Sequence, residues 1–208
     1  AGKKKLFMRI FCYVGAAGCV GLYWFDADHL ELSMIPFFLA SLGFWGSVGF
    51  YNAFLPEIAP REEHDRLSAK GYAMGYWSSL IILVICAGMI MGIGTHTTTF
   101  CFVIVGLWWF GFAHITFNAL PDSEIRDLPP GNIWLQGFKE LKGVAIELNG
   151  FTHLKRYLGA FFVMSMAIQT IIIMASSFGI KEVGLNASEL IITIFVVNLL
   201  AIPGAFGL

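Results

Sequence analysis

The polar side chains best suited to contact a solute lie within a long apolar run near the C-terminal end of the sequence. Ser165 and Gln169 are four residues apart, so they share one face of a helix, and Thr170 follows directly. A primary amide both donates and accepts hydrogen bonds, which suits a polar or zwitterionic small molecule. The pattern favours solute binding at Gln169, with hydrogen bonding between helices as the alternative role.

Polar residues in other apolar runs are further candidates, because a polar group in hydrocarbon is costly unless it faces the interior of a helix bundle. Ser47 is a second candidate solute contact. Tyr51 and Asn52 lie near the end of the same run and could gate a solute path or cap their helix. His114 could carry a proton, and it lies one turn before Asn118. An interfacial histidine is the alternative interpretation.

The composition indicates that most of the chain lies in lipid. Hydrophobic residues make up 57% of the 208 residues and charged residues 13%, whereas soluble domains carry about a quarter charged residues. A net charge of −1 gives no indication of a nucleic-acid partner. Six mostly apolar runs reach the length of about 20 residues that a bilayer requires; they cover roughly residues 7–25, 34–55, 71–93, 99–118, 157–177 and 189–207. The sequence predicts an all-α integral membrane protein with six transmembrane helices.

The basic residues predict an orientation. Twelve of the thirteen Lys and Arg residues fall on alternate connections, namely the N-terminal segment and the segments 56–70 and 119–156. The positive-inside rule assigns these connections to the cytoplasm, so both ends of this chain are expected there. Short loops without an organellar signal favour a bacterial inner membrane. Arg61, Asp65 and Arg66 of the segment 56–70 are expected to form a conformational latch or a solvated turn.

The end of the second apolar run resembles a known family. A Tyr-Asn-x-x-Leu-Pro-x-Ile-Ala segment at 51–59 precedes Ser-x-x-Gly-x-x-x-Gly-Tyr at 68–76. This resembles the loop between the fourth and fifth helices of the vacuolar-effluxer-like, autophagy-related family of the major facilitator superfamily. Gln169-Thr170-Ile171 also resembles the family's seventh helix, which lines the central cavity. The resemblance implies a transporter, and amino-acid efflux is associated with the vacuolar members.

The same resemblance implies a domain organisation. The chain would hold helices three to eight of a twelve-helix major facilitator fold, with a natural six-helix protein as the alternative. Residues 1–118 would then be four helices of the N-terminal half-bundle, 119–156 the cytoplasmic central loop, and 157–208 the first two helices of the C-terminal half-bundle. Within the central loop, Pro129, Pro130 and Gly131 interrupt the chain and Asn132 could cap a helix. The apolar residues that then recur at helical spacing are Trp134, Phe138, Leu141, Ala145 and Leu148, which predicts an amphipathic helix on the inner membrane surface.

Glycines at regular spacing predict close contacts between helices, because small residues let backbones approach. Gly43, Gly46 and Gly49 recur every third residue. Pairs four residues apart occur at 71 and 75 and again at 88 and 92.

Enzyme chemistry has little support in the sequence. The motifs His-Glu-x-x-His, Gly-x-Ser-x-Gly and Gly-x-x-x-x-Gly-Lys-Ser/Thr are missing, and the five histidines are too scattered to build a metal site. We therefore expect no cofactor and no metal. The expected function is secondary transport of small solutes by alternating access, with the solute, the bilayer and the remaining helices of the same full-length protein as partners. A non-transporting membrane scaffold and, less well supported, an intramembrane enzyme are the alternatives.

Overall fold

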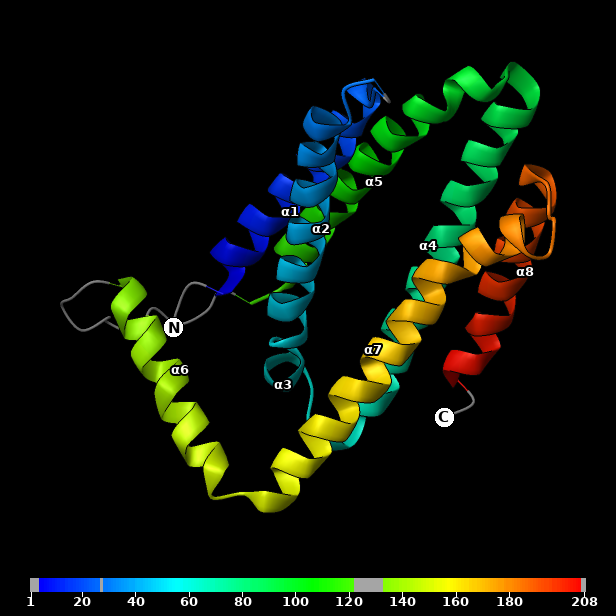
Figure 1. Ribbon diagram of the computed structural model, residues 1–208. Coiled ribbons are helices and arrows are strands. Elements are labelled where there is room, and N and C mark those ends of the chain that lie inside the picture. Colours follow the sequence, from blue (N-terminus) through cyan, green and yellow to red (C-terminus); the bar gives the residue numbers. More distant parts are fainter. Residues whose placement is uncertain (1–3, 27, 122–132, 207–208) are drawn as a thin grey trace. The chain divides into compact units, whose positions relative to one another are not determined.

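The computed structural model describes residues 4–26, 28–121 and 133–206, and every regular element among them is helical (Figure 1). The α-helices are α1 (Lys4–Gly21), α2 (Leu30–Asn52), α3 (Leu55–Ile58), α4 (His64–Ile93), α5 (Thr98–Ala119), α6 (Ile133–Asn149), α7 (Thr152–Lys181) and α8 (Ala187–Phe206). Short 3-10 turns occupy Leu22–Trp24, Arg61–Glu63 and Thr95–Thr97. Within these residues, six helices are long and apolar enough to cross a membrane. The predicted fold class and the predicted number of spans are confirmed.

The chain divides into two compact units. The first, Ala1–Arg126 with Thr193–Leu208, holds α1 to α5. The second, Asp127–Ile192, holds α6 and α7, and α8 is divided between the two. The predicted chain break and helix cap at positions 129–132 lie outside the described residues. The helix α6 is present over the stretch where the apolar spacing predicts one.

The helices α1, α2 and α5 pack around a buried core in the first unit. A Cβ atom placed on Gly43 of α2 would overlap the backbone of Gly15 in α1, so the two helices cross with their backbones in contact. Gly106 of α5 likewise faces the Ala16 carbonyl and the Val20 side chain of α1. The buried apolar cluster consists of Met8, Cys12, Phe54, Ala113, Phe117 and Leu120. This core holds α1 between α2 and α5.

The glycine spacing predicts only some of these contacts. Gly43 meets α1 as expected, and Gly46 lies against the ring of Phe11. In contrast, a Cβ on Gly49 would have no neighbour within 4 Å among the described residues. The same holds at positions 75, 88 and 92, so the close contact expected there is missing from the part of the chain that the structure describes.

The segment between α2 and α4 is more ordered than a loop over 56–70. After α3 and one 3-10 turn, α4 already begins at His64, so Asp65 and Arg66 lie in its first turn. The stretch from Arg61 to position 70 contains no Gly or Pro to break a helix. The negative charge of Asp65 in the first turn also interacts favourably with the helix dipole and stabilises the start of α4. Hydropathy identifies only the apolar part of a helix. The polar first turns of α4 therefore escaped the prediction of an apolar run at 71–93.

Candidate functional site

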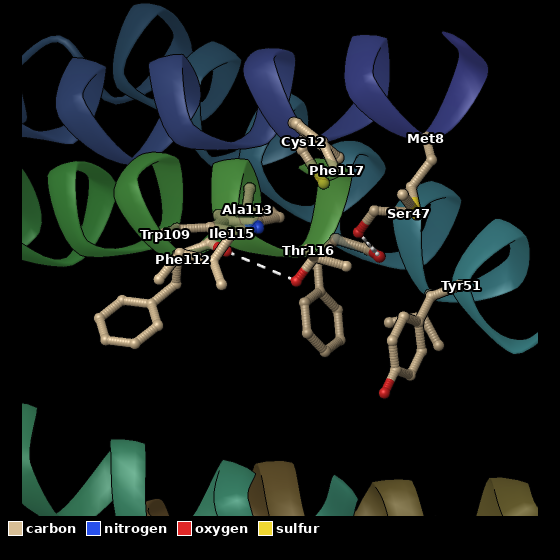
Figure 2. Close-up of a pocket in the computed structure, with 12 residues that line it drawn as sticks. Met8, Cys12, Ser47, Tyr51, Trp109, Phe112, Ala113, Ile115, Thr116 and Phe117 are labelled. Atoms are coloured by element: carbon tan, nitrogen blue, oxygen red, sulfur yellow. Dashed lines mark hydrogen bonds between the residues drawn. The ribbon is translucent and has the colours of Figure 1, made fainter. Parts of the chain in front are cut away.

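A pocket of about 340 Å³ lies against α1, α2 and α5 (Figure 2). It is lined by Met8, Cys12, Phe44, Ser47, Val48, Tyr51, Trp109, Phe112, Ala113, Ile115, Thr116 and Phe117. The lining is mostly apolar and aromatic, and it contains no charged side chain. Its polar side-chain groups are three hydroxyls, one thiol and an indole N–H. Such a lining suits an uncharged or aromatic part of a small molecule.

Two residues singled out from the sequence share this pocket. Ser47 and Tyr51 are one turn apart on α2. The buried Ser47 hydroxyl donates to the Phe44 carbonyl oxygen at 2.9 Å, which leaves its lone pairs able to accept. The Tyr51 hydroxyl has no hydrogen-bond partner among the described residues, and its ring points away from α1, as does that of Phe112 (Figure 2). Tyr51 therefore keeps a free donor at the pocket.

His114 lies on a different side of α5 and contacts α1. Its Nδ1 is 2.8 Å from the Phe110 carbonyl oxygen, and its Nε2 is 3.3 Å from the Tyr13 hydroxyl oxygen. A carbonyl oxygen only accepts, so Nδ1 carries a proton, and in the neutral ring Nε2 accepts from Tyr13. Tyr13 was missed by sequence reasoning because the pairing of α1 with α5 spans 101 residues. Asn52 and Asn118 are exposed.

The Gln169 group belongs to the second unit, whereas the pocket belongs to the first. Gln169 and Ser165 are half-buried on α7, and no described residue hydrogen-bonds with the Gln169 amide. The Thr170 hydroxyl donates to the Met166 carbonyl oxygen at 2.8 Å within the same helix. Asn198 of α8 offers a contrast, because its amide donates to the Ile194 carbonyl oxygen at 2.9 Å. Gln169 therefore carries a polar group that its own helix leaves unsatisfied.

The segment between α2 and α4 is joined to α1 through Glu57, which was not among the residues singled out from the sequence. The side chains of Arg61, Asp65 and Arg66 are exposed. An ion pair instead joins Lys4 Nζ of α1 to Glu57 Oε1 of α3. In the described parts of the chain, no group of three or more His, Cys, Asp or Glu side chains is placed to hold a metal ion.

These features define a multi-pass α-helical membrane protein with an aromatic, hydroxyl-bearing pocket in one helix bundle. The chain matches the family model described as "Vacuole effluxer Atg22 like" over residues 1–64 and 59–208, and it belongs to that family.

Curated relatives agree with this family. The protein named "Uncharacterized MFS-type transporter YxiO" from Bacillus subtilis is 27% identical over 210 residues, which cover 97% of this chain and 49% of that protein. "Autophagy-related protein 22-1" from Aspergillus terreus is 26% identical over 77% of this chain and 30% of its own length. "Autophagy-related protein 22" from Coccidioides immitis is 24% identical over 98% and 44%. The chain thus spans half or less of the length of these relatives. No solved structure matches it.

Proposed function

We propose that this chain is part of a secondary transporter that moves small solutes, amino acids among them, across a membrane by alternating access. The observation that carries the proposal is the match to the vacuole effluxer family. This match covers residues 1–64 and 59–208. The name of the Bacillus relative, an MFS-type transporter, points in the same direction. Noncovalent transport also fits a pocket that offers hydrogen bonds and aromatic surface without a charged side chain.

The remaining assignments belong to the same proposal. Residues 1–118 would form four helices of an N-terminal half-bundle and 157–208 two helices of a C-terminal half-bundle, with 119–156 as the central loop. The basic connections would face the cytoplasm, in a bacterial inner membrane. Since the chain spans about half of the Bacillus relative, the rest of a twelve-helix protein would supply the other helices.

The Gln169 amide is the proposed solute contact of α7, with Ser165 and Thr170 beside it. An unpaired amide in hydrocarbon is costly, and a solute or the water of a transport path would relieve that cost. In the first unit, Ser47 is the proposed contact. Tyr51 and Asn52, at the end of α2, are proposed as gating residues.

The helix α5 and the α2–α4 segment have proposed roles as well. No Asp or Glu lies deep in any of the six spans of this chain, so proton coupling within it would require His114, with Asn118 one turn away. Arg61, Asp65 and Arg66 would act as a solvated turn or a conformational latch.

Flux through the full-length protein in vesicles tests the proposal, with a panel of labelled amino acids as probes. Gln169→Ala should lower kcat/KM for the transported solute by about tenfold, because a hydrogen bond to a charged solute is lost. Asn198→Ala is the matched control, since that amide already donates to a carbonyl oxygen of its own helix. Normal flux in Gln169→Ala would remove this residue from the solute path. A native protein that moves none of the solutes would instead favour the scaffold function.

A further inference from the structure

One face of α1 meets α5 through three polar side chains at regular spacing. Lys5, Arg9 and Tyr13 are each four residues apart, so they follow one another along this face. Lys5 Nζ donates to the Leu120 carbonyl oxygen at 2.8 Å. The Arg9 guanidinium carbon lies 5.4 Å from the centre of the Phe117 ring. Tyr13 pairs with His114, so the cations occupy the end of this seam nearest the start of α1.

Arg9 stands out because its charge has no hydrogen-bond acceptor among the described residues. Its Nε is buried without a hydrogen-bond partner, and no described residue accepts a hydrogen bond from its guanidinium. The Phe117 ring offers a cation–π contact but no lone pair. An arginine keeps its proton at any relevant pH, so it cannot escape the cost of burial by becoming neutral.

Among the described residues, no carboxylate is placed to neutralise Arg9, and Asp122 and Glu124, which follow α5 in the sequence, lie outside them. Neither α1 nor α5 contains an Asp or a Glu. The carboxylate of Glu57 is paired with Lys4. Besides Lys4 and Lys5, the other titratable groups along the seam are Tyr13 and His114, and these bind each other. The described part of the protein therefore supplies no anionic partner for the Arg9 guanidinium, whose positive charge favours one.

The position of Arg9 favours the lipid headgroups as the source of an anion. Arg9 is five residues beyond the first residue of α1, which places it about 7–8 Å along the helix axis. A long basic side chain at such a position extends back to the lipid headgroups while its stem stays in the apolar layer. Lipid headgroups carry phosphate oxygens, and a guanidinium pairs with phosphate through two parallel hydrogen bonds.

We propose that Arg9, with Lys5 one turn away, forms a binding site for the phosphate of an anionic phospholipid at the α1–α5 seam. The lipid phosphate would accept hydrogen bonds from the Arg9 guanidinium. The net negative charge of the lipid would offset the positive charge of the seam. The site lies on α1 and α5, and its Phe117 ring also lines the pocket.

Lipid retention by the full-length protein tests the site. Protein purified from mixed phosphatidylglycerol and phosphatidylcholine is examined by native mass spectrometry, and native protein should keep phosphatidylglycerol in preference. Arg9→Gln should lower this retention by about tenfold, because charge-assisted hydrogen bonds are lost. Arg9→Lys should show an intermediate loss and guards against misfolding, since it keeps the charge. The matched control is Arg156→Gln, the same substitution at an exposed arginine of α7, which should leave lipid retention unchanged.

Two results would overturn the site. Equal retention of phosphatidylglycerol by native protein and Arg9→Gln would show that Arg9 is not part of a lipid site. Equal retention of both lipids by native protein would show that the protein does not prefer an anionic lipid. A thermal unfolding series with inorganic phosphate then separates the sources. Stabilisation of native protein, but not of Arg9→Gln, by phosphatidylglycerol alone supports the lipid. Equal stabilisation by inorganic phosphate keeps the phosphate chemistry and overturns the lipid as its source.

Discussion

The Tyr13 hydroxyl oxygen lies 3.3 Å from Nε2 of His114, and this contact joins α1 to α5. The two rings are 5.7 Å apart, and Tyr13 also meets the Phe117 ring edge-on. His114 also donates through Nδ1 to the Phe110 carbonyl oxygen of its own helix, which orients Nε2 toward Tyr13. The pair therefore links His114 of α5, the candidate proton carrier, to Tyr13 of α1.

Tyr13→Phe removes the hydroxyl and keeps the ring. We expect it to lower the free energy of unfolding by about 0.5–1.5 kcal/mol, the usual net value of one hydrogen bond. Thermal unfolding in detergent measures the change. Tyr23→Phe is the matched control, because Tyr23 packs against Trp24 and Phe100 through its ring and its hydroxyl has no described partner. Equal effects of the two variants would contradict the hydrogen bond.

Gly43→Ala tests the crossing of α1 and α2. The added methyl group would overlap the backbone of Gly15, which cannot rotate away as a side chain can. Overpacking of this kind costs about 1–3 kcal/mol. Gly49→Ala on the same helix meets open space, so it should be neutral or stabilise by up to about 1 kcal/mol through helix propensity. The melting temperature of Gly43→Ala should fall, whereas that of Gly49→Ala should stay the same or rise. A Gly43→Ala protein as stable as the native protein would refute the close crossing of α1 and α2.

Ser78→Ala tests the link between α4 and α5. The Trp108 indole Nε1 donates to Ser78 Oγ at 2.8 Å, so the substitution leaves a half-buried donor without its partner. We expect a loss of about 1–3 kcal/mol in the free energy of unfolding. Ser79→Ala removes a neighbouring exposed hydroxyl and should have little effect. Indole fluorescence during unfolding reports on the contact, and an unchanged stability of Ser78→Ala would argue against it.

Tyr51→Phe tests whether the pocket contacts solute. The lost hydroxyl has no described partner, so stability should stay nearly unchanged. If the hydroxyl binds solute, KM for flux should rise about 2–10-fold, as for one neutral hydrogen bond. Tyr72→Phe, an exposed tyrosine of α4, is the control. Unchanged KM in Tyr51→Phe would leave the pocket without a solute role at this position.

The sequence alone determines the class of the protein and the number of its spans. Each span must supply about 20 mostly apolar residues to match the bilayer. Because these residues are consecutive, the sequence shows them directly. The segment at 51–76 likewise indicates the family from local spacing, and the family match confirms it. The beginning of α4 at His64 escapes the same reasoning, since polar residues continue a helix outside the lipid.

Only the tertiary structure decided which faces meet. Ser47 and Tyr51 are neighbours on α2 by spacing, but the pocket that they share also requires α1 and α5. The spacing of glycines did not distinguish Gly43, which touches α1, from Gly49, which faces open space. In lipid, an apolar face can meet either a helix or an acyl chain at similar cost, so hydrophobicity does not select the contact. The selection comes from pairs far apart in sequence, such as Tyr13 with His114 and Arg9 with Phe117.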